Sequence, residues 1–345
     1  MSKLRIAAPA LHALARDILA AAGTPREDAA VWAETLVFAN LRGVDSHGVI
    51  RIPRYLEQIA GGDIKPAAEM RLLKAAGAIA LLDAAGAPGP VAMKRAIEEA
   101  IAAAKRVHVG WCVARNITHA GAVGHFALQA AAQGMAGLVM TASIPLMAWP
   151  GSRKAVVSTN PIAIAMPGGA HPPLLLDMAT ATVSLGKILG AKASGTPIPT
   201  GWGIDAEGAD TTDAAKVATL LPMAGPKGAG LSLMIECLAS LVATNPMIAP
   251  ALRGEKSYGM NGVAIALDLS AFGDPAALAA DVDDLAATIA AQPRAAGAEA
   301  LLVPGERGDA ERARRLADGI PLPPGVWKQL VEAAGRLGVE VPALV

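Results

Sequence analysis

The sequence predicts an α/β fold in which a sheet with flanking helices is joined to a helical lobe. From residue 79 to residue 143, short apolar strands alternate with helical segments, a pattern typical of strands that lie between helices. The two ends of the chain have helical periodicity instead. The chain has 345 residues. Because one hydrophobic core stops growing beyond roughly 250–300 residues, we expect about two lobes.

The helical lobe is predicted from both ends of the chain. We expect helices over residues 9–22 and 25–39, and a short helix that begins after Pro53 and ends at Gly61 and Gly62. Near the carboxyl end, residues 324–338 form another helix. We therefore divide the chain into an N-terminal helical segment (residues 1–75) that packs with C-terminal helices (residues 305–345), and an α/β domain (residues 76–304).

The strands of the α/β domain are predicted from apolar runs bounded by Gly and Pro. They are residues 79–86, 109–117, 135–143, 160–168, 172–180 and 261–272, and the helices are residues 90–107, 122–134, 228–243 and 274–292. The helix over residues 228–243 is almost wholly apolar, so we expect it to be buried on all sides. Residues 191–230 are rich in Gly and Pro and are predicted to be irregular, a common setting for functional loops.

Composition excludes several classes of protein. Lys plus Arg and Asp plus Glu both number 30, so no basic excess indicates a nucleic-acid partner. No window of about 18 consecutive apolar residues predicts a membrane span. The first residues form an amphipathic helix and not a signal peptide, so we expect a cytoplasmic protein. Cys112 and Cys237 lie in apolar runs and are expected to be reduced core thiols.

Familiar catalytic fingerprints are missing. A G-x-G-x-x-G dinucleotide motif between a strand and a helix does not occur, and "GPKGAG" at residues 225–230 has its glycines in the reverse order. The sequence also lacks P-loop spacing, the G-x-S-x-G elbow and H-E-x-x-H. His119 and His125 are six residues apart, a poor spacing for two ligands on one helix face, so we expect no metal site.

The stretch "VDSHGVIRIPRY" (residues 44–55) is the strongest signal of chemistry. His47, Arg51 and Tyr55 are four residues apart in sequence, so in one helix they would share a face. Arg binds a carboxylate through two parallel hydrogen bonds, and His exchanges a proton near neutral pH. Such a face suits a small anionic oxo compound. The alternative is a surface helix with an ordinary histidine.

Three further segments carry polar groups where a ligand could bind. His119 lies in "NITHAG" after a strand, where α/β sheets bind ligands, although a plain turn is the alternative. Asp177 follows three leucines and either orients a histidine or caps the following helix. Lys227 lies among glycines before the apolar helix and either holds a phosphate or ribose or is an ordinary surface lysine.

Several motifs taken together resemble the type 2 malate/L-lactate dehydrogenase family. They are "SHGVIRIPRY", "NITHAGAVGHF", "STNPIAIAMP", "LDMATATVSLGKI", "IPTGWGIDAEGADTTD", "GPKGAGLSLMIECLA" and "PGE". They occur in this order over about residues 8–338. The family includes malate, ureidoglycolate and sulfolactate dehydrogenases and the Δ1-piperideine-2-carboxylate reductases.

The resemblance implies an oxidoreductase that uses NAD or NADP, bound by a non-Rossmann sheet, and that acts on a small 2-oxo or 2-hydroxy acid. It also implies a homodimer with the active site near the subunit interface. Two other readings stay open, a ketimine reductase acting on Δ1-piperideine-2-carboxylate or Δ1-pyrroline-2-carboxylate, and a non-catalytic binding protein on the same fold.

The resemblance also implies roles for individual residues. Ser46, His47 and Asp177 match the proton-relay group of the family, and His119 matches a second histidine that is the acid/base in some members. Arg51, Tyr55, Thr159 and Asn160 match positions that bind the substrate. The implied cofactor contacts are His119, Gly121, His125, Phe126, Ser143, Asp177, Met178, Ala179, Lys227, Gly305, Glu306 and Arg307. Departures from the family pattern occur at Ile117, Ala181 and Pro226 and leave the exact substrate open.

Overall fold

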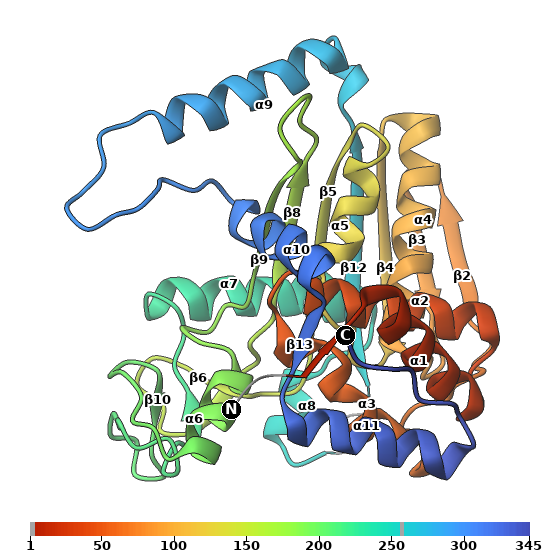
Figure 1. Ribbon diagram of the computed structural model, residues 1–345. Coiled ribbons are helices and arrows are strands. Elements are labelled where there is room, and N and C mark those ends of the chain that lie inside the picture. Colours follow the sequence, from red (N-terminus) through yellow and green to blue (C-terminus); the bar gives the residue numbers. More distant parts are fainter. Residues whose placement is uncertain (1–3, 256–258) are drawn as a thin grey trace.

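The computed structural model describes residues 4–255 and 259–345 and has a mixed α/β architecture built around a large sheet (Figure 1). The sheet has seven strands in the order β2-β3-β4-β12-β5-β8-β9. Their bounds are β2 (Arg71–Ala76), β3 (Ile79–Asp83), β4 (Val109–Ile117), β12 (Met260–Asp268), β5 (Met135–Ala142), β8 (Ile162–Met166) and β9 (Leu174–Met178). The predicted α/β class is confirmed.

The pairing within this sheet is mostly antiparallel. β3 and β4 run parallel, whereas β12 lies antiparallel between β4 and β5, and β8 and β9 continue the antiparallel pattern. The alternation of strands and helices predicted the strands themselves. It did not predict that a strand from residues 260–268 inserts between two strands formed more than 100 residues earlier.

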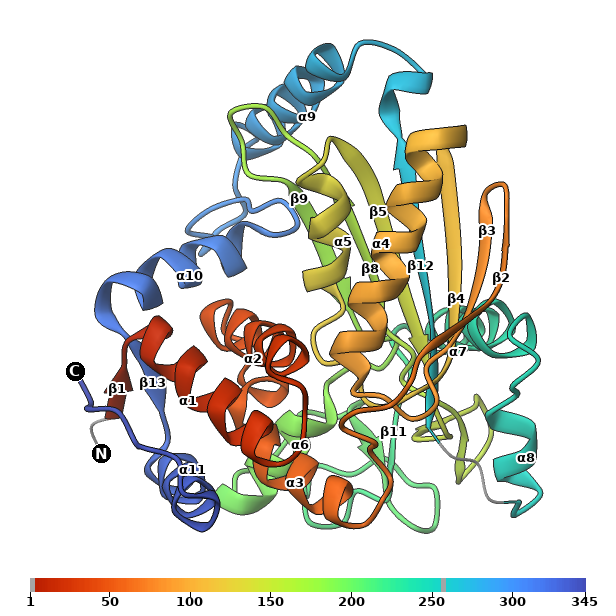
Figure 2. The same ribbon diagram turned by 90° about the vertical axis from the view of Figure 1, so that its right-hand side faces the viewer.

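One face of the sheet carries small residues and is covered by two helices, α4 (Gly89–Val107) and α5 (Gly124–Ala131), as Figure 2 shows. Cys112, Ala114 and Ala264 point to this face and are fully buried. Small strand residues allow helices to approach closely, which makes a dense core without many aromatic side chains.

The opposite face of the sheet, called here the outer face, carries larger residues. Val113 and Val263 are buried there under α7 (Pro226–Glu236) and the π-helical turn η3 (Cys237–Leu241). Leu233 and Met234 on α7 are 37% and 56% exposed. The prediction that this helix is buried on all sides is therefore wrong, because the protein's own core covers only its sheet-facing side.

The helical lobe combines both ends of the chain (Figure 2). It contains α1 (Ala8–Ala21), α2 (Arg26–Leu41), α3 (Ile52–Ala60), α10 (Glu306–Asp318) and α11 (Pro324–Leu337). β1 (Leu4–Ile6) pairs antiparallel with β13 (Ile320–Leu322). Trp32, Leu36 and Leu330 are fully buried in the shared core. This packing fixes the carboxyl-terminal helices against the segment that carries His47.

Several segments between residues 144 and 255, apart from β8, β9, α7 and η3, form a smaller layer at one end of the large sheet. It contains β6 (Met147–Ala148), β7 (Ala155–Val157), β10 (Gly203–Ile204), β11 (Thr219–Leu220), α6 (Leu185–Ser194) and α8 (Ile248–Leu252). The region predicted to be irregular, residues 191–230, therefore contains the end of α6, two short strands and the first turn of α7. Figure 1 shows α9 (Pro275–Ala290) projecting from the sheet before the chain returns to α10. No helix in residues 4–255 and 259–345 has the length and apolar content that a bilayer crossing requires.

Candidate active site

The stretch from residue 44 to residue 55 is not one helix. It forms two short 3₁₀ turns, η1 (Asp45–His47) and η2 (Val49–Arg51), before α3 begins at Ile52. Gly48 has extended backbone (φ −88°, ψ −156°) between the turns. A Cβ on Gly48 would lie 2.2 Å from Oδ1 of Asn40, the atom that accepts a hydrogen bond from the backbone of Val49. The chain therefore bends around Asn40, and the single helix that would place the three side chains on one face does not form.

The bend still brings the predicted residues together. The ring of His47 stacks on that of His119 with centroids 5.4 Å apart and planes at 27°. The phenol oxygen of Tyr55 lies 2.7 Å from Nδ1 of His119, and Oγ of Ser46 lies 3.1 Å from Nδ1 of His47. Each imidazole is thus held at Nδ1 by a hydroxyl group. Within the described residues, Nε2 of neither ring has a hydrogen-bond partner, so both Nε2 atoms are available to a ligand.

The site favours neutral imidazoles. Burial, together with the nearby positive charge of Arg51, lowers the pKa of His47 to about 4. Burial, followed by the charges of His47 and Arg51, lowers the pKa of His119 well below 6.5. Burial also raises the pKa of Tyr55, so its phenol stays protonated. At neutral pH the free protein therefore holds two neutral imidazoles and one phenol next to a guanidinium.

Arg51 is a cation without a carboxylate partner. Its Nε donates to the backbone oxygen of Ser46 at 2.7 Å, which fixes the guanidinium beside the histidines. No Asp or Glu in the described part of the chain forms an ion pair with it. A half-buried guanidinium with free N–H groups is a site for an anion, and carboxylates fit its planar fork well.

We expect the free energy of unfolding to decrease as the pH falls from about 6.5 to about 4. In this window the unfolded chain takes up a proton on His47 and the folded protein does not, so acid favours unfolding. The groups that act on this ring are Arg51 and His119. Denaturant titrations at about pH 7, 6 and 5 would measure the slope, which should be smaller in His47→Gln. Equal slopes in the two proteins would contradict this assignment.

In the described residues, the Asp177 side chain is hydrogen-bonded to a backbone amide and not to a histidine. Its Oδ2 accepts a hydrogen bond from the backbone N–H of Gly124 at 3.0 Å, at the start of α5. The sequence left open whether Asp177 orients a histidine or caps the helix that follows it. It caps an earlier helix instead, because β9 runs beside the start of α5. The side chain is exposed, yet the surrounding protein partly desolvates it and raises its pKa to about 6.

Of the other predicted cofactor residues, three lie on or before α5. Gly121 is buried with a positive φ of 76°, and a Cβ there would lie 3.1 Å from the side chain of Thr35. His125 is 8% exposed and packs on Phe38 with ring centroids 4.9 Å apart. Phe126 is fully buried in the core beneath the sheet. Phe126 therefore supports the start of α5 from within the core.

The remaining predicted residues gather near the end of β9 and the start of α7. The Asn160 side chain accepts from the backbone of Ser143 and donates to Ser232 of α7. The backbone N–H of Thr180 donates to the carbonyl of Thr159, so Thr159 lies directly beyond Met178 and Ala179. Lys227 in the first turn of α7 is exposed and forms no ion pair with the described residues.

The segment from Gly305 to Arg307 lies at the start of α10. The carbonyl of Gly305 accepts a hydrogen bond from Arg42 at 2.9 Å, and Arg42 also pairs with Asp309. Oε1 of Glu306 lies 3.2 Å from Nε2 of His171. The Arg307 side chain is exposed.

Sequence reasoning missed two buried arginines whose ion pairs support the site. Arg315 of α10 donates to Oδ1 and Oδ2 of Asp45 at 2.7 and 3.1 Å, two residues before His47. Arg42 connects the end of α2 to Gly305 in the same way. These partners lie more than 260 residues apart in sequence, and no local pattern marks such a pairing.

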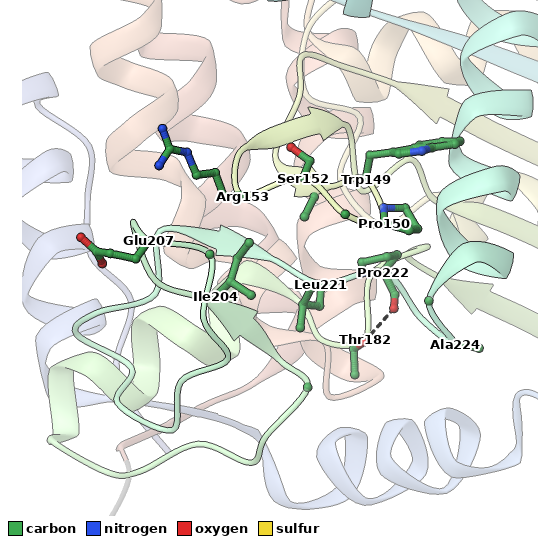
Figure 3. A pocket seen from close by; sticks show the side chains of 15 residues that line it. Trp149, Pro150, Ser152, Arg153, Thr182, Ile204, Glu207, Leu221, Pro222 and Ala224 are labelled. Carbon is green, nitrogen blue, oxygen red and sulfur yellow. Dashed lines mark hydrogen bonds between the residues drawn. The ribbon is translucent and has the colours of Figure 1, made fainter.

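A separate cavity of about 650 Å³ lies in the smaller layer (Figure 3). Figure 3 shows Trp149 at one end and Glu207 at the other, with Thr182 hydrogen-bonded to the carbonyl of Pro222 at 3.2 Å. None of the residues predicted to bind substrate or cofactor lines this cavity. The chemistry of the histidine pair, and not cavity size, therefore identifies the candidate active site.

Comparison with known proteins identifies the family. A family model described as malate/L-lactate dehydrogenase matches residues 6–331. The chain belongs to the malate/L-lactate dehydrogenase family. The family predicted from the sequence motifs is confirmed.

Relatives in this family match nearly the whole chain. L-sulfolactate dehydrogenase from Methanocaldococcus jannaschii is 35% identical over 94% of this chain and 95% of its own length. NAD⁺-dependent ureidoglycolate dehydrogenase from Escherichia coli K12 is 39% identical over 70% of each chain. The structure of malate dehydrogenase from Pyrococcus horikoshii superposes with a TM-score of 0.89 at 32% identity, covering 99% of this chain and 97% of that one. The relatives of this family member are thus oxidoreductases.

Proposed function

We propose that this protein transfers a hydride between a nicotinamide cofactor and C2 of a small 2-oxo or 2-hydroxy acid. The observation that carries the proposal is the unpaired Arg51 guanidinium beside the stacked pair His47 and His119. Arg51 would bind the substrate carboxylate and so fix which face of C2 is presented. The names of the relatives, which include malate, sulfolactate and ureidoglycolate dehydrogenases, support a 2-hydroxy acid.

The two imidazoles would handle the substrate oxygen. In reduction that oxygen gains a proton, and in oxidation the hydroxyl loses one. Each ring has Nδ1 engaged by a hydroxyl, from Ser46 or Tyr55, which leaves Nε2 for the substrate. Thr159 and Asn160 would complete the pocket. Asp177 would act through the start of α5 and not as the third member of a relay with Ser46, because its hydrogen bond goes to Gly124.

The residues near the end of β9 fit a nicotinamide dinucleotide. Oγ1 of Thr180 is fully buried and has no hydrogen-bond partner in the described residues, although buried hydroxyls normally have one. A Cβ on Gly228 would lie 2.7 Å from the Thr180 carbonyl oxygen, so the first turn of α7 lies against Thr180. The exposed Lys227 in that turn would offer a cation for phosphate or ribose. When bound, the nicotinamide supplies or accepts the hydride. The missing G-x-G-x-x-G motif and the antiparallel pairing of the sheet support a non-Rossmann binding mode.

A substrate screen with NADH and NADPH side by side tests this proposal. The panel contains 2-oxo acids and the cyclic imino acids Δ1-piperideine-2-carboxylate and Δ1-pyrroline-2-carboxylate. Oxidation of cofactor with a 2-oxo acid is the expected result. Turnover restricted to the imino acids would make the protein a ketimine reductase. No turnover, together with no cofactor binding in a fluorescence titration, would indicate a non-catalytic binding protein and overturn the proposal.

The proposed partner for the outer face of the sheet is a second copy of this chain. Trp111, Leu138 and Ile265 are half-buried on this face, and Met234 of α7 is 56% exposed beside it. Exposed apolar patches of this kind mark interfaces, and an apolar patch can pack against its own copy about a two-fold axis.

Met234→Glu is therefore expected to convert a dimer into a monomer, because it would bury two carboxylates across the two-fold axis. Light scattering coupled to size-exclusion chromatography measures the mass. Phe272→Glu is the matched control, since Phe272 is 73% exposed but lies outside the outer-face cluster. A monomeric wild type, or a dimer that survives Met234→Glu, would contradict this interface.

A further inference from the structure

The hydrogen bond between Tyr55 and His119 has one favourable direction. Tyr55 is 2% exposed, and its phenol oxygen has one hydrogen-bond partner in the described residues, Nδ1 of His119 at 2.7 Å. If Nδ1 carried the hydrogen and donated it to the phenol oxygen, the phenol O–H would be buried without an acceptor. Leaving a buried donor unsatisfied costs about 1–3 kcal/mol. The phenol therefore donates, and Nδ1 of His119 accepts.

This direction fixes the tautomer of the ring. A neutral imidazole carries one hydrogen, so when Nδ1 accepts, the hydrogen is on Nε2. The ring is held in place as well, because Tyr55 itself packs on the fully buried Trp32 with ring centroids 5.0 Å apart. His119 thus presents a fixed N–H donor from Nε2, which has no partner in the described part of the chain.

The hydroxyl on His47 does not restrict its ring in this way. Ser46 is only half-buried, so water can satisfy its hydroxyl in either direction. His47 can therefore change between its tautomers and its protonated form. Arg51 and His119 are the charged and titratable groups that act on this ring, and Arg51 favours the neutral form. A substrate carboxylate bound to Arg51 would offset that positive charge and make proton uptake by His47 easier.

We propose that Tyr55 is a positioning residue that keeps His119 as a neutral hydrogen-bond donor to the substrate oxygen, and that His47 is the residue that exchanges the proton. This inference rests on the proposed function. In the reducing direction, C2 gains the hydride and the carbonyl π electrons move to the oxygen, which takes a proton from Nε2 of His47. The Nε2–H of His119 stabilises the negative charge on that oxygen during the step and keeps its own hydrogen. Tyr55 then acts through His119. The family resemblance had implied a different role for it, namely direct binding of the substrate carboxylate.

The tautomer is measured without substrate or cofactor. In the ¹⁵N spectrum of the full chain labelled at its six histidines, His119→Gln identifies the His119 signals by their loss. We expect a protonated Nε2 and an unprotonated Nδ1 in the wild type, and a mixture of tautomers in Tyr55→Phe. A protonated Nδ1 in the wild type would overturn the inference even if the protein proves to be a dehydrogenase. The expected tautomer in a protein that turns over nothing would overturn the proposed function instead.

Kinetics separate positioning from substrate binding. For Tyr55→Phe we expect kcat to fall about 10-fold or more, with KM for the acid nearly unchanged, because a preorganised donor is lost. A rise in KM alone would return Tyr55 to the substrate carboxylate. Arg54→Ala is the control: Arg54 lies on the same helix one residue before Tyr55, but its side chain is 65% exposed and pairs with Glu57, away from His119. We expect it to retain both kcat and KM.

The pH profile assigns the two histidines. His119→Gln replaces the imidazole by an amide N–H donor that does not titrate. Its kcat is expected to fall, but kcat should still change with pH as in the wild type, in the limb of the pH–rate profile where His47 titrates. His47→Gln is expected to remove that limb. The opposite pattern, with the limb lost in His119→Gln and kept in His47→Gln, would show that His119 exchanges the proton and would overturn the inference.

Discussion

Arg51→Ala is expected to raise KM for the acid substrate about 100-fold, since a charge-assisted hydrogen-bonded pair contributes roughly 1.5–3 kcal/mol and each 1.4 kcal/mol is a factor of ten. The kcat is expected to change less, because the carboxylate is bound in both the ground state and the transition state. Arg51→Lys keeps the charge and loses the planar fork, so we expect an intermediate KM. Initial rates across substrate concentrations measure both parameters.

The chain offers a matched control three residues away. Arg54 has a side chain that is 65% exposed and pairs with Glu57 on the surface of α3. Arg54→Ala removes the same charge from the same segment without touching the histidines, and its KM should stay near that of the wild type. KM for the cofactor should not change in either variant. If Arg51→Ala and Arg54→Ala behave alike, Arg51 does not bind the substrate.

The same substitution has an electrostatic consequence. The positive charge of Arg51 contributes to the lowered pKa of both His47 and His119. Removing it is expected to raise the pKa of both imidazoles, and the pH at which His47 loses its proton should therefore rise. A shift of the pH–rate limb to higher pH in Arg51→Ala, absent in Arg54→Ala, would check this expectation.

Local structure was predictable from the sequence wherever the signal was local. The strand Val109–Ile117 and the helix Pro324–Leu337 fall within one residue of the expected bounds, because apolar periodicity and flanking Gly or Pro define them. The insertion of β12 between β4 and β5 was not predictable. Its register depends on contacts between residues more than 100 positions apart, and a single sequence carries no record of them.

The candidate site was predicted in composition more than in geometry. His47, Arg51 and Tyr55 do converge with His119, but through two 3₁₀ turns instead of one helix, because Gly48 must pack against Asn40. For Asp177 the sequence left two roles open, and its hydrogen bond goes to the start of α5, a helix that lies earlier in the chain. Residue types indicate which chemistry is available. Which atoms come into contact depends on tertiary packing between distant segments, and the sequence alone did not predict those contacts.

The second large effect on stability and activity is expected at Arg315, near the carboxyl end of the chain, because this residue holds the turn that carries His47. The side chain of Arg315 is 7% exposed, and it donates to both carboxylate oxygens of Asp45 and to the backbone carbonyl of Asn40 at 2.6 Å. It therefore joins α10 to the end of α2 and to the 3₁₀ turn that carries His47. Asn40 is the residue around which the chain bends at Gly48.

Arg315→Ala is expected to lower the free energy of unfolding by about 3 kcal/mol, the lower end of the range for breaking a buried ion pair, because Asp45 is half-exposed and water can reach it. In the protein that remains folded, the turn at Asp45–His47 loses its anchor. We expect kcat to fall more than KM rises, since the position of the proton-exchanging ring matters most in the transition state. Denaturant titration gives the stability, and steady-state rates at a permissive temperature give the split.

Arg314→Ala separates this anchoring from a general effect of charge on α10. Arg314 is adjacent, has a side chain that is 50% exposed, and pairs with the same Glu311 that Arg315 contacts. Because exposed ion pairs contribute about 0–1 kcal/mol, Arg314→Ala should change stability little and leave kcat intact. Asp45→Asn tests the same ion pair from the other side. It keeps the shape of the side chain but removes the charge that faces Arg315, so it should reproduce most of the loss in kcat expected for Arg315→Ala. If Arg315→Ala proves as mild as Arg314→Ala, α10 covers the active-site turn without holding it, and the position of His47 is set by α2 and Asn40 alone.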